Sequence, residues 1–212
     1  MRGRARPSDR GMTLVELAIA TTILATVVVA LAAGMSTAFG VFRGTVTFVD
    51  LERRANAALD KIASELADVP ESALITDLEA VDFTSSISYQ RQTGWADGAP
   101  VFGPVTTIAW APDPMDPTDG KDNDGDGVID EGVITRKAGS ESPITIATNV
   151  ALLFEGETDD NKDENGNGLA DETGLSFSLE GGAVAIRITM TRRGPDGEVS
   201  TASAESSIRL QD

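Results

Sequence analysis

The sequence predicts an α+β protein in which one long N-terminal helix packs on an antiparallel β domain. Three observations lead to this fold class. An uncharged apolar stretch near the amino end is long enough to span a membrane, the next segment has helical periodicity, and the remainder consists of short runs with β-type alternation. One helix followed by consecutive strands is typical of a domain whose sheet is antiparallel.

Residues 17–42 form the apolar stretch. These 26 residues carry no charge, and as a helix they would extend about 39 Å, which exceeds the hydrocarbon core of a bilayer. Four arginines and one aspartate precede them within residues 1–10, and basic residues beside a first hydrophobic segment stay in the cytoplasm. A secretory signal peptide has a shorter apolar region of roughly 7–15 residues. We therefore expect residues 12–42 to be a transmembrane helix and the rest of the chain to lie outside the cytoplasm.

A single carboxylate, Glu16, lies at the edge of this apolar stretch, five residues after Gly11. An ionisable group in lipid costs roughly 2.5–3.5 kcal/mol at the centre of a helix, and less near its end, unless a partner neutralises it. A free α-amine would be such a partner. Cleavage after Gly11 would create this amine, either on the same chain or on a neighbouring subunit.

The run Gly-Met-Thr-Leu-Val-Glu from Gly11 to Glu16, followed by an apolar helix, resembles the prepilin cleavage and methylation motif of type IV pilins and type II secretion pseudopilins. The resemblance implies that residues 1–11 are a leader peptide, which prepilin peptidase removes by cutting between Gly11 and Met12. It also implies that the new amine of Met12 is methylated and that Glu16 guides the subunit into a filament. Other pilins or pseudopilins, an inner-membrane assembly platform and membrane lipid are the implied partners.

An ordinary signal anchor is the alternative, with Glu16 merely placed at the membrane interface. The protein would then be an anchored, calcium-binding surface or adhesion protein that does not polymerise. The basic leader and the register of glycine, glutamate and helix favour the pilin-like interpretation. The mature amino terminus separates the two, because it would be Met12 in a pilin and Met1 in an anchor.

The composition of the chain limits the remaining function classes. Its 212 residues include no His and no Cys, and the net charge is −17 at pH 7. This excludes a disulfide framework, a thiolate nucleophile and a Cys/His zinc site, and so acidic a surface repels nucleic acid. A two-carboxylate hydrolase is the remaining enzymatic option, but each carboxylate cluster is better explained as a metal loop. We expect no catalytic residues.

Residues 43–69 are predicted to be the soluble, amphipathic half of the helix. Apolar residues recur every three or four positions, with charged residues between them, so this half should pack its apolar stripe on the sheet. Thr47 and Asp50 fit a capping box, which would allow a local break near Gly44. Pro70 should end the helix, because the residue before a proline avoids the helical region.

Residues 70–212 are predicted to form the β domain. Its short runs are separated by clusters of Gly, Pro and Asp, and the turn at residues 194–197 indicates a hairpin. The order of helix, meandering strands and final hairpin is similar to the J-class minor pseudopilins and their minor-pilin relatives. The predicted strands are 81–89, 105–111, 132–136, 144–155, 174–180, 183–192 and 200–210.

Two acidic loops, residues 119–131 and 160–172, interrupt these strands. Offset by 41 residues, both fit the pattern D-x-x-D-x-[DN]-x-[DN]-G-x-x-D-E. Oxygens at alternate positions, a glycine at the turn and a later carboxylate are what Ca²⁺ requires from a short loop, and the pattern resembles the calcium loops of EF-hand, dockerin and thrombospondin type 3 repeats. The candidate ligands are Asp119, Asp122, Asp124, Asp126, Val128 through its carbonyl, Asp130 and Glu131 in the first loop, and Asp160, Asp163, Asn165, Asn167, Asp171 and Glu172 in the second.

Both loops depart from the EF-hand at its twelfth position, where Val133 and Gly174 replace the bidentate glutamate. Glu131 and Glu172, or the first aspartate of each loop, would supply the missing oxygens. The first loop carries more charge than the second, so we expect it to bind Ca²⁺ more tightly. The ion would have a structural role, with a dissociation constant on the order of 0.1–1 mM. Solvated acidic loops without metal are the alternative, and the recurrence of the pattern favours calcium.

Overall fold

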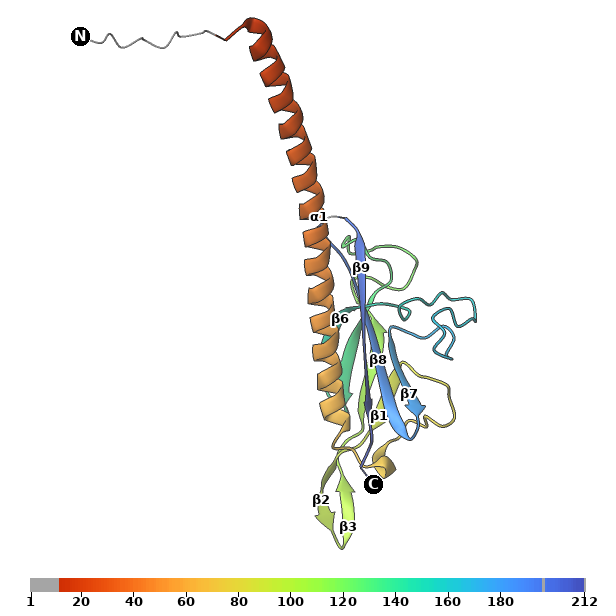
Figure 1. The fold of residues 1–212 in the computed structure, drawn as a ribbon. Helices are drawn as coiled ribbons and strands as arrows, with labels where there is room; N and C mark the ends of the chain where they lie inside the picture. Colours follow the sequence, from red (N-terminus) through yellow and green to blue (C-terminus); the bar gives the residue numbers. More distant parts are fainter. Residues whose placement is uncertain (1–11, 196, 212) are drawn as a thin grey trace, which may run out of the picture. The chain divides into compact units, whose positions relative to one another are not determined.

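The structure is a computed structural model that describes residues 12–195 and 197–211. The chain divides into two compact units, the first ending at Phe42 and the second beginning at Arg43. The described residues form helix α1 (Leu14–Leu66), the short 3₁₀ helix η1 (Glu71–Ala73) and nine strands (Figure 1). The predicted α+β class is confirmed. The leader, residues 1–11, lies outside the described residues, and Gly11 lies there with it.

In the first unit, the helical residues present apolar side chains on all sides. Ile23 and Leu31, for example, are 58% and 62% exposed. Helix α1 is long and apolar enough to cross a membrane, and threonine hydroxyls in this segment bond to carbonyls of the helix itself. The hydroxyls of Thr22 and Thr26 donate to the carbonyls of Ala18 and Thr22, at 2.8 and 2.7 Å. Such internal pairing suits a helix surrounded by lipid.

Helix α1 continues through Gly44, so the predicted local break is absent. Thr47 does not cap a new helix, because its hydroxyl donates to the carbonyl of Arg43 one turn earlier, at 3.1 Å. Asp50 accepts a hydrogen bond from Arg54 Nε at 2.8 Å instead of reaching back to Thr47. Thr47 and Asp50 therefore both form their hydrogen bonds within one continuous helix.

The second unit contains a seven-stranded antiparallel sheet (Figure 1). Strands β1, β4, β5, β6 and β8 follow one another across it. Strand β7 pairs with the first part of β8, while β9 pairs along the whole of β8. The bounds are β1 (Ser86–Tyr89), β4 (Thr106–Pro112), β5 (Gly132–Ala138), β6 (Ile144–Val150), β7 (Leu175–Glu180), β8 (Ala183–Arg193) and β9 (Val199–Ile208). All seven predicted strands are present, although the first begins only at Ser86 and the fourth ends at Val150.

A separate two-stranded hairpin, β2 (Gln92–Ala96) and β3 (Ala99–Phe102), was not predicted. Its strands are mostly exposed and lack an apolar face, and Trp95 is 70% exposed. The turn residues Asp97 and Gly98 both have positive φ, 52° and 78°. This is the Asp-Gly hairpin signal, and it was the one local cue available in the sequence.

The core lies between the second half of α1 and the sheet. The buried helix residues are spaced three or four apart, as predicted, which confirms that the amphipathic half packs on the sheet. Large sheet side chains with no exposed surface, such as Ile108 and Phe177, belong to the same cluster. The helix contributes Leu51, Ala55, Ala58, Leu59, Ile62 and Leu66.

Glu65 ties the last turn of α1 to two strands. Its Oε2 accepts hydrogen bonds from Tyr89 Oη of β1 at 2.6 Å and from Arg136 Nε of β5 at 2.7 Å. Burial alone would raise the pKa of Glu65, but the hydrogen bonds from Tyr89 and Arg136 outweigh it and hold that pKa below its usual value. Burial and the adjacent carboxylate raise the pKa of Tyr89, so the phenol remains a donor.

Candidate functional site

The amino end of α1 is closed by Thr13 and Glu16. The amide and the hydroxyl of Thr13 each donate to Glu16 Oε2 at 2.9 Å, and the amide of Glu16 donates back to Thr13 Oγ1 at 3.2 Å. This reciprocal pairing is a capping box. The Thr-x-x-Glu spacing was visible in the sequence, but our sequence analysis considered only an amine as the partner of Glu16.

The capping box places a carboxylate at the positive end of the helix dipole, at the point where the apolar segment begins. Two roles were predicted at this end, methylation of the Met12 amine and charge pairing by Glu16. Met12 directly precedes Thr13 and is largely exposed. A new α-amine on Met12 would therefore lie one residue before the N-cap. Glu16 can complete the capping box and still carry its negative charge at this end of the helix.

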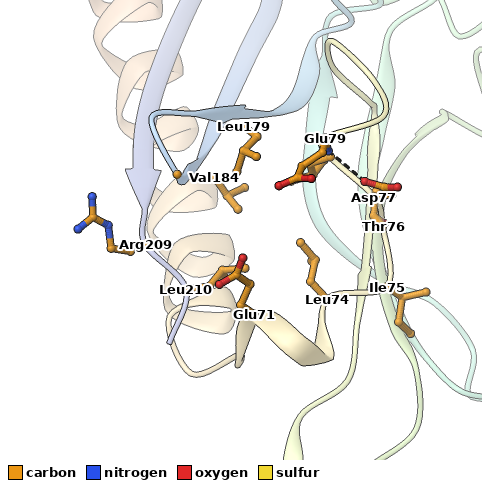
Figure 2. Close-up of a pocket in the computed structure, with 12 residues that line it drawn as sticks. Glu71, Leu74, Ile75, Thr76, Asp77, Glu79, Leu179, Val184, Arg209 and Leu210 are labelled. Atoms are coloured by element: carbon orange, nitrogen blue, oxygen red, sulfur yellow. Dashed lines mark hydrogen bonds between the residues drawn. The ribbon is translucent and has the colours of Figure 1, made fainter. Parts of the chain in front are cut away.

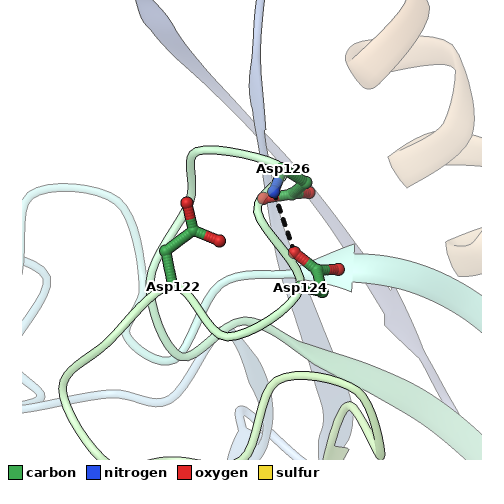
Figure 3. Close-up of side chains that lie close together, drawn as sticks. All are labelled: Asp122, Asp124 and Asp126. Atoms are coloured by element: carbon green, nitrogen blue, oxygen red, sulfur yellow. Dashed lines mark hydrogen bonds between the residues drawn. The ribbon is translucent and has the colours of Figure 1, made fainter.

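In the first acidic loop, Asp122, Asp124 and Asp126 each bring one carboxylate oxygen within 4.8 Å of the others (Figure 3). The backbone shapes this cluster. The amides of Gly125 and Gly127, both at positive φ, donate to the two oxygens of Asp122 at 2.7 and 3.0 Å. The amide of Asp126 donates to Asp124 Oδ1 at 2.9 Å. Three of the predicted ligands thus converge.

The second acidic loop repeats this hydrogen-bond pattern. The amides of Gly166 and Gly168 donate to the two oxygens of Asp163, at 2.6 and 2.8 Å. The amide of Asn167 donates to Asn165 Oδ1 at 2.9 Å. The internal repeat found in the sequence is therefore a repeat of backbone conformation as well.

Asp130 and Asp171 close their loops. Asp130 Oδ1 accepts hydrogen bonds from the amides of Asp119 and Gly120, both at 2.9 Å. Asp171 Oδ2 accepts the equivalent bond from the amide of Asn161 at 2.8 Å. Each side chain joins the two ends of its loop. A ligand role for these two aspartates stays a prediction.

The first aspartate of each loop pairs with a lysine. Asp119 Oδ2 lies 3.0 Å from Lys121 Nζ, and Asp160 forms the matching pair with Lys162. The described groups of converging carboxylates do not contain Asp119 or Asp160. Glu131 and Glu172 are not in these groups either, so the source of the additional oxygens stays a prediction.

Glu131 is buried beside Asp116, which the sequence analysis did not select. Asp116 and Glu131 are 0% and 2% exposed. Among the described residues, Asp116 Oδ2 and Glu131 Oε2 have no hydrogen-bond partner. Burial, and then the carboxylates of Asp126 and Asp116, raise the pKa of Glu131 to about 7. The amide of Asn123 donates to Asp116 Oδ1 at 2.7 Å, which joins Asp116 to the loop.

The corresponding glutamate of the second loop, Glu172, is fully buried but well partnered. Its Oε1 accepts hydrogen bonds from Ser176 Oγ at 3.0 Å and from Arg187 Nη1 at 3.4 Å, and its Oε2 accepts one from Asn167. In this loop the converging carboxylates are those of Glu157, Glu164 and Asp171, and the first two were not predicted.

The structure explains why neither loop has a glutamate at the twelfth EF-hand position. Val133 is a buried residue of β5, paired with Ala111 of β4. A Cβ on Gly174 would lie 1.9 Å from the carbonyl oxygen of Ala151. Val133 belongs to the sheet and Gly174 directly precedes β7, so additional oxygens must come from earlier in each loop.

A surface cavity of about 580 Å³ lies elsewhere on the second unit (Figure 2). Its lining combines apolar side chains, including Leu74 and Leu210, with the carboxylates of Glu71 and Glu79. None of the cleavage, assembly or metal-binding residues predicted from the sequence lines this cavity.

A helix that is long and apolar enough to cross a membrane, is capped by Thr13 and Glu16, and continues into a sheet-packed half fits a single-pass membrane anchor with an α+β domain. Residues 6–32 match the family model of the prokaryotic N-terminal methylation motif. This match supports a type IV pilin or pseudopilin, a class of structural subunits that prepilin peptidase processes. Comparison with curated proteins and with solved structures found no match.

Proposed function

We propose that the protein is a minor pilin or minor pseudopilin, a subunit of a type IV pilus-like filament or of a type II secretion pseudopilus. The observation that supports this most strongly is the methylation motif at residues 6–32, which leads directly into the exposed apolar part of α1. After assembly, the acidic domain faces the periplasm or the exterior.

The exposed apolar residues of the first unit require a nonpolar environment. Lipid supplies it before assembly, and the helices of neighbouring subunits supply it in a filament. Glu16 requires a positive partner in either setting. A methylated α-amine on Met12 of a neighbouring subunit meets this requirement, and it exists only after the leader is removed.

Calcium bound in the acidic loops is proposed to stabilise the domain. The cluster of Asp122, Asp124 and Asp126 holds three negative charges close together, and an ion that binds only the folded state adds RT ln(1 + [L]/Kd) to its stability. This role is structural and needs no catalytic group.

A minor rather than a major subunit, of the J class, is proposed from the arrangement of the domain. The chain passes from α1 through meandering strands to a final hairpin of β8 and β9. Large loops at residues 119–131 and 160–172 add acidic surface.

Photo-crosslinking in the native host tests the filament proposal. A photoreactive amino acid replaces Leu24, which is 63% exposed on α1, and adducts are identified by mass spectrometry. We expect adducts with other pilin-like subunits, and we expect none when the probe replaces Lys121 on the first acidic loop. Adducts at residue 24 with lipid alone would instead support the anchored calcium-binding surface protein.

A further inference from the structure

We infer that the first acidic loop is the divalent-cation site of this protein and that Asp116 and Glu131 complete it, whereas in the second loop Arg187 takes the place of the ion. This inference rests on the calcium binding proposed above. It adds a ligand outside the repeated motif and predicts one ion per chain instead of two.

The first loop contains buried negative charge without a protein partner. Asp116 and Glu131 are almost completely buried, and one oxygen of each lacks a hydrogen bond within the described part of the chain. Burying an ionised carboxylate is costly unless it is paired or bound to a metal. These two oxygens therefore favour a cation at this loop independently of the exposed aspartates.

The two buried carboxylates adjoin the exposed cluster. Asp116 is joined to the loop through the amide of Asn123 at 2.7 Å, and Glu131 lies close enough to Asp126 and Asp116 to interact with both. The converging carboxylates themselves are those of Asp122, Asp124 and Asp126. With Asp116 and Glu131 beside this cluster, the loop offers five carboxylates, and hard oxygen ligands suit Ca²⁺.

The second loop has the same layout, but its two buried glutamates are partnered by the protein itself. Glu157 lies 41 residues after Asp116, and both of its oxygens accept backbone hydrogen bonds, from Asn165 at 3.3 Å and from Asp171 at 3.0 Å. Glu172 lies 41 residues after Glu131 and is paired with the buried guanidinium of Arg187.

Arg187 supplies from β8 the positive charge that the second loop needs. Its side chain is 6% exposed and also pairs with Glu180 and Glu205. The arginine beside the first loop is Arg193, whose Cδ would lie 2.2 Å from a Cβ on Gly127. Its Nε donates to the carbonyl of Gly197 at 2.8 Å.

Calorimetric titration of the full-length protein in detergent with CaCl₂, after treatment with a chelator, tests the inference. We expect one ion per chain. The variants Asp116→Asn and Glu131→Gln should weaken binding at least tenfold, because each removes a charged ligand. Two variants in the second loop, Glu157→Gln at the counterpart of Asp116 and Asp163→Asn at the counterpart of Asp122, should leave the stoichiometry and the affinity unchanged.

Thermal melts of the same proteins distinguish a lost ligand from a damaged fold. Without calcium, Asp116→Asn should melt at a higher temperature than the unsubstituted protein, because an unpaired buried charge is gone. With calcium, the order should reverse. A lower melting temperature in both conditions would contradict a ligand role for Asp116.

Two other outcomes would overturn the inference in different ways. Two ions per chain, or binding that Asp116→Asn does not affect, would contradict the one-site assignment and leave the proposed calcium binding intact. Absence of any calcium binding would remove both. The filament proposal depends on neither result, because the crosslinking experiment tests it separately.

Discussion

Replacing Glu16 with alanine should reduce the crosslinked adducts formed from position 24 at least tenfold. Insertion into the membrane and removal of the leader should continue, because the apolar segment and Gly11 are unchanged. The loss follows from charge, since the alanine variant has no carboxylate to meet the α-amine of a neighbouring subunit in a nonpolar environment. Adduct yield and leader removal are measured in the same cells by immunoblotting.

The variant Glu16→Gln separates two roles of this side chain. Glutamine at this position can still complete a capping box with Thr13, but it carries no charge. Assembly should fail in both variants if charge pairing matters, and it should survive in Glu16→Gln if only the helix cap matters. Glu52→Ala, an exposed glutamate further along α1, is the matched control and should assemble normally. Normal assembly of Glu16→Ala would contradict the pairing argument.

Gly174→Ala should destabilise the second unit by about 3 kcal/mol, the upper part of the usual range for overpacking. The added Cβ would lie 1.9 Å from the carbonyl oxygen of Ala151, and backbone atoms cannot move aside as a flexible side chain can. The same residue is held on both sides, because its amide donates to Leu152 O at 3.0 Å and its carbonyl accepts from the amide of Thr189 at 2.7 Å. The melting temperature should fall by roughly 10 °C.

Gly94→Ala is the matched control for this prediction. Gly94 lies in β2, and a Cβ there meets no atom within 4 Å. Both variants are melted in excess calcium and followed by circular dichroism, so that they are compared in the same state. The melting temperature should fall strongly for Gly174→Ala and hardly at all for Gly94→Ala. Equal shifts would show that the contact with Ala151 is not the cause.

Most of the fold followed from the periodicity of apolar residues. Strand β8 (Ala183–Arg193) was predicted almost to the residue, because its alternation is regular and its neighbours are turn residues. The hairpin of β2 and β3 was missed because its strands bury little and show no apolar face. The break near Gly44 was wrong because Thr47 bonds to its own helix, a choice that spacing alone does not determine.

The acidic loops were predicted only in part, for a physical reason. Alternating aspartates predicted the cluster of Asp122, Asp124 and Asp126, since a short loop brings alternate positions together. Asp116 precedes the repeated motif, and only folding brings it beside Glu131. The role of Arg187 could not be predicted either, because it depends on the pairing of β7 with β8, which brings Arg187 back to Glu172.

The mass of the mature amino-terminal peptide, measured on protein purified from its native host, tests whether the leader is removed after Gly11. We expect a chain that begins at Met12, with or without a methyl group on its amine. A functional protein that still begins at Met1 would contradict it, because Glu16 would then have no processed amine to meet.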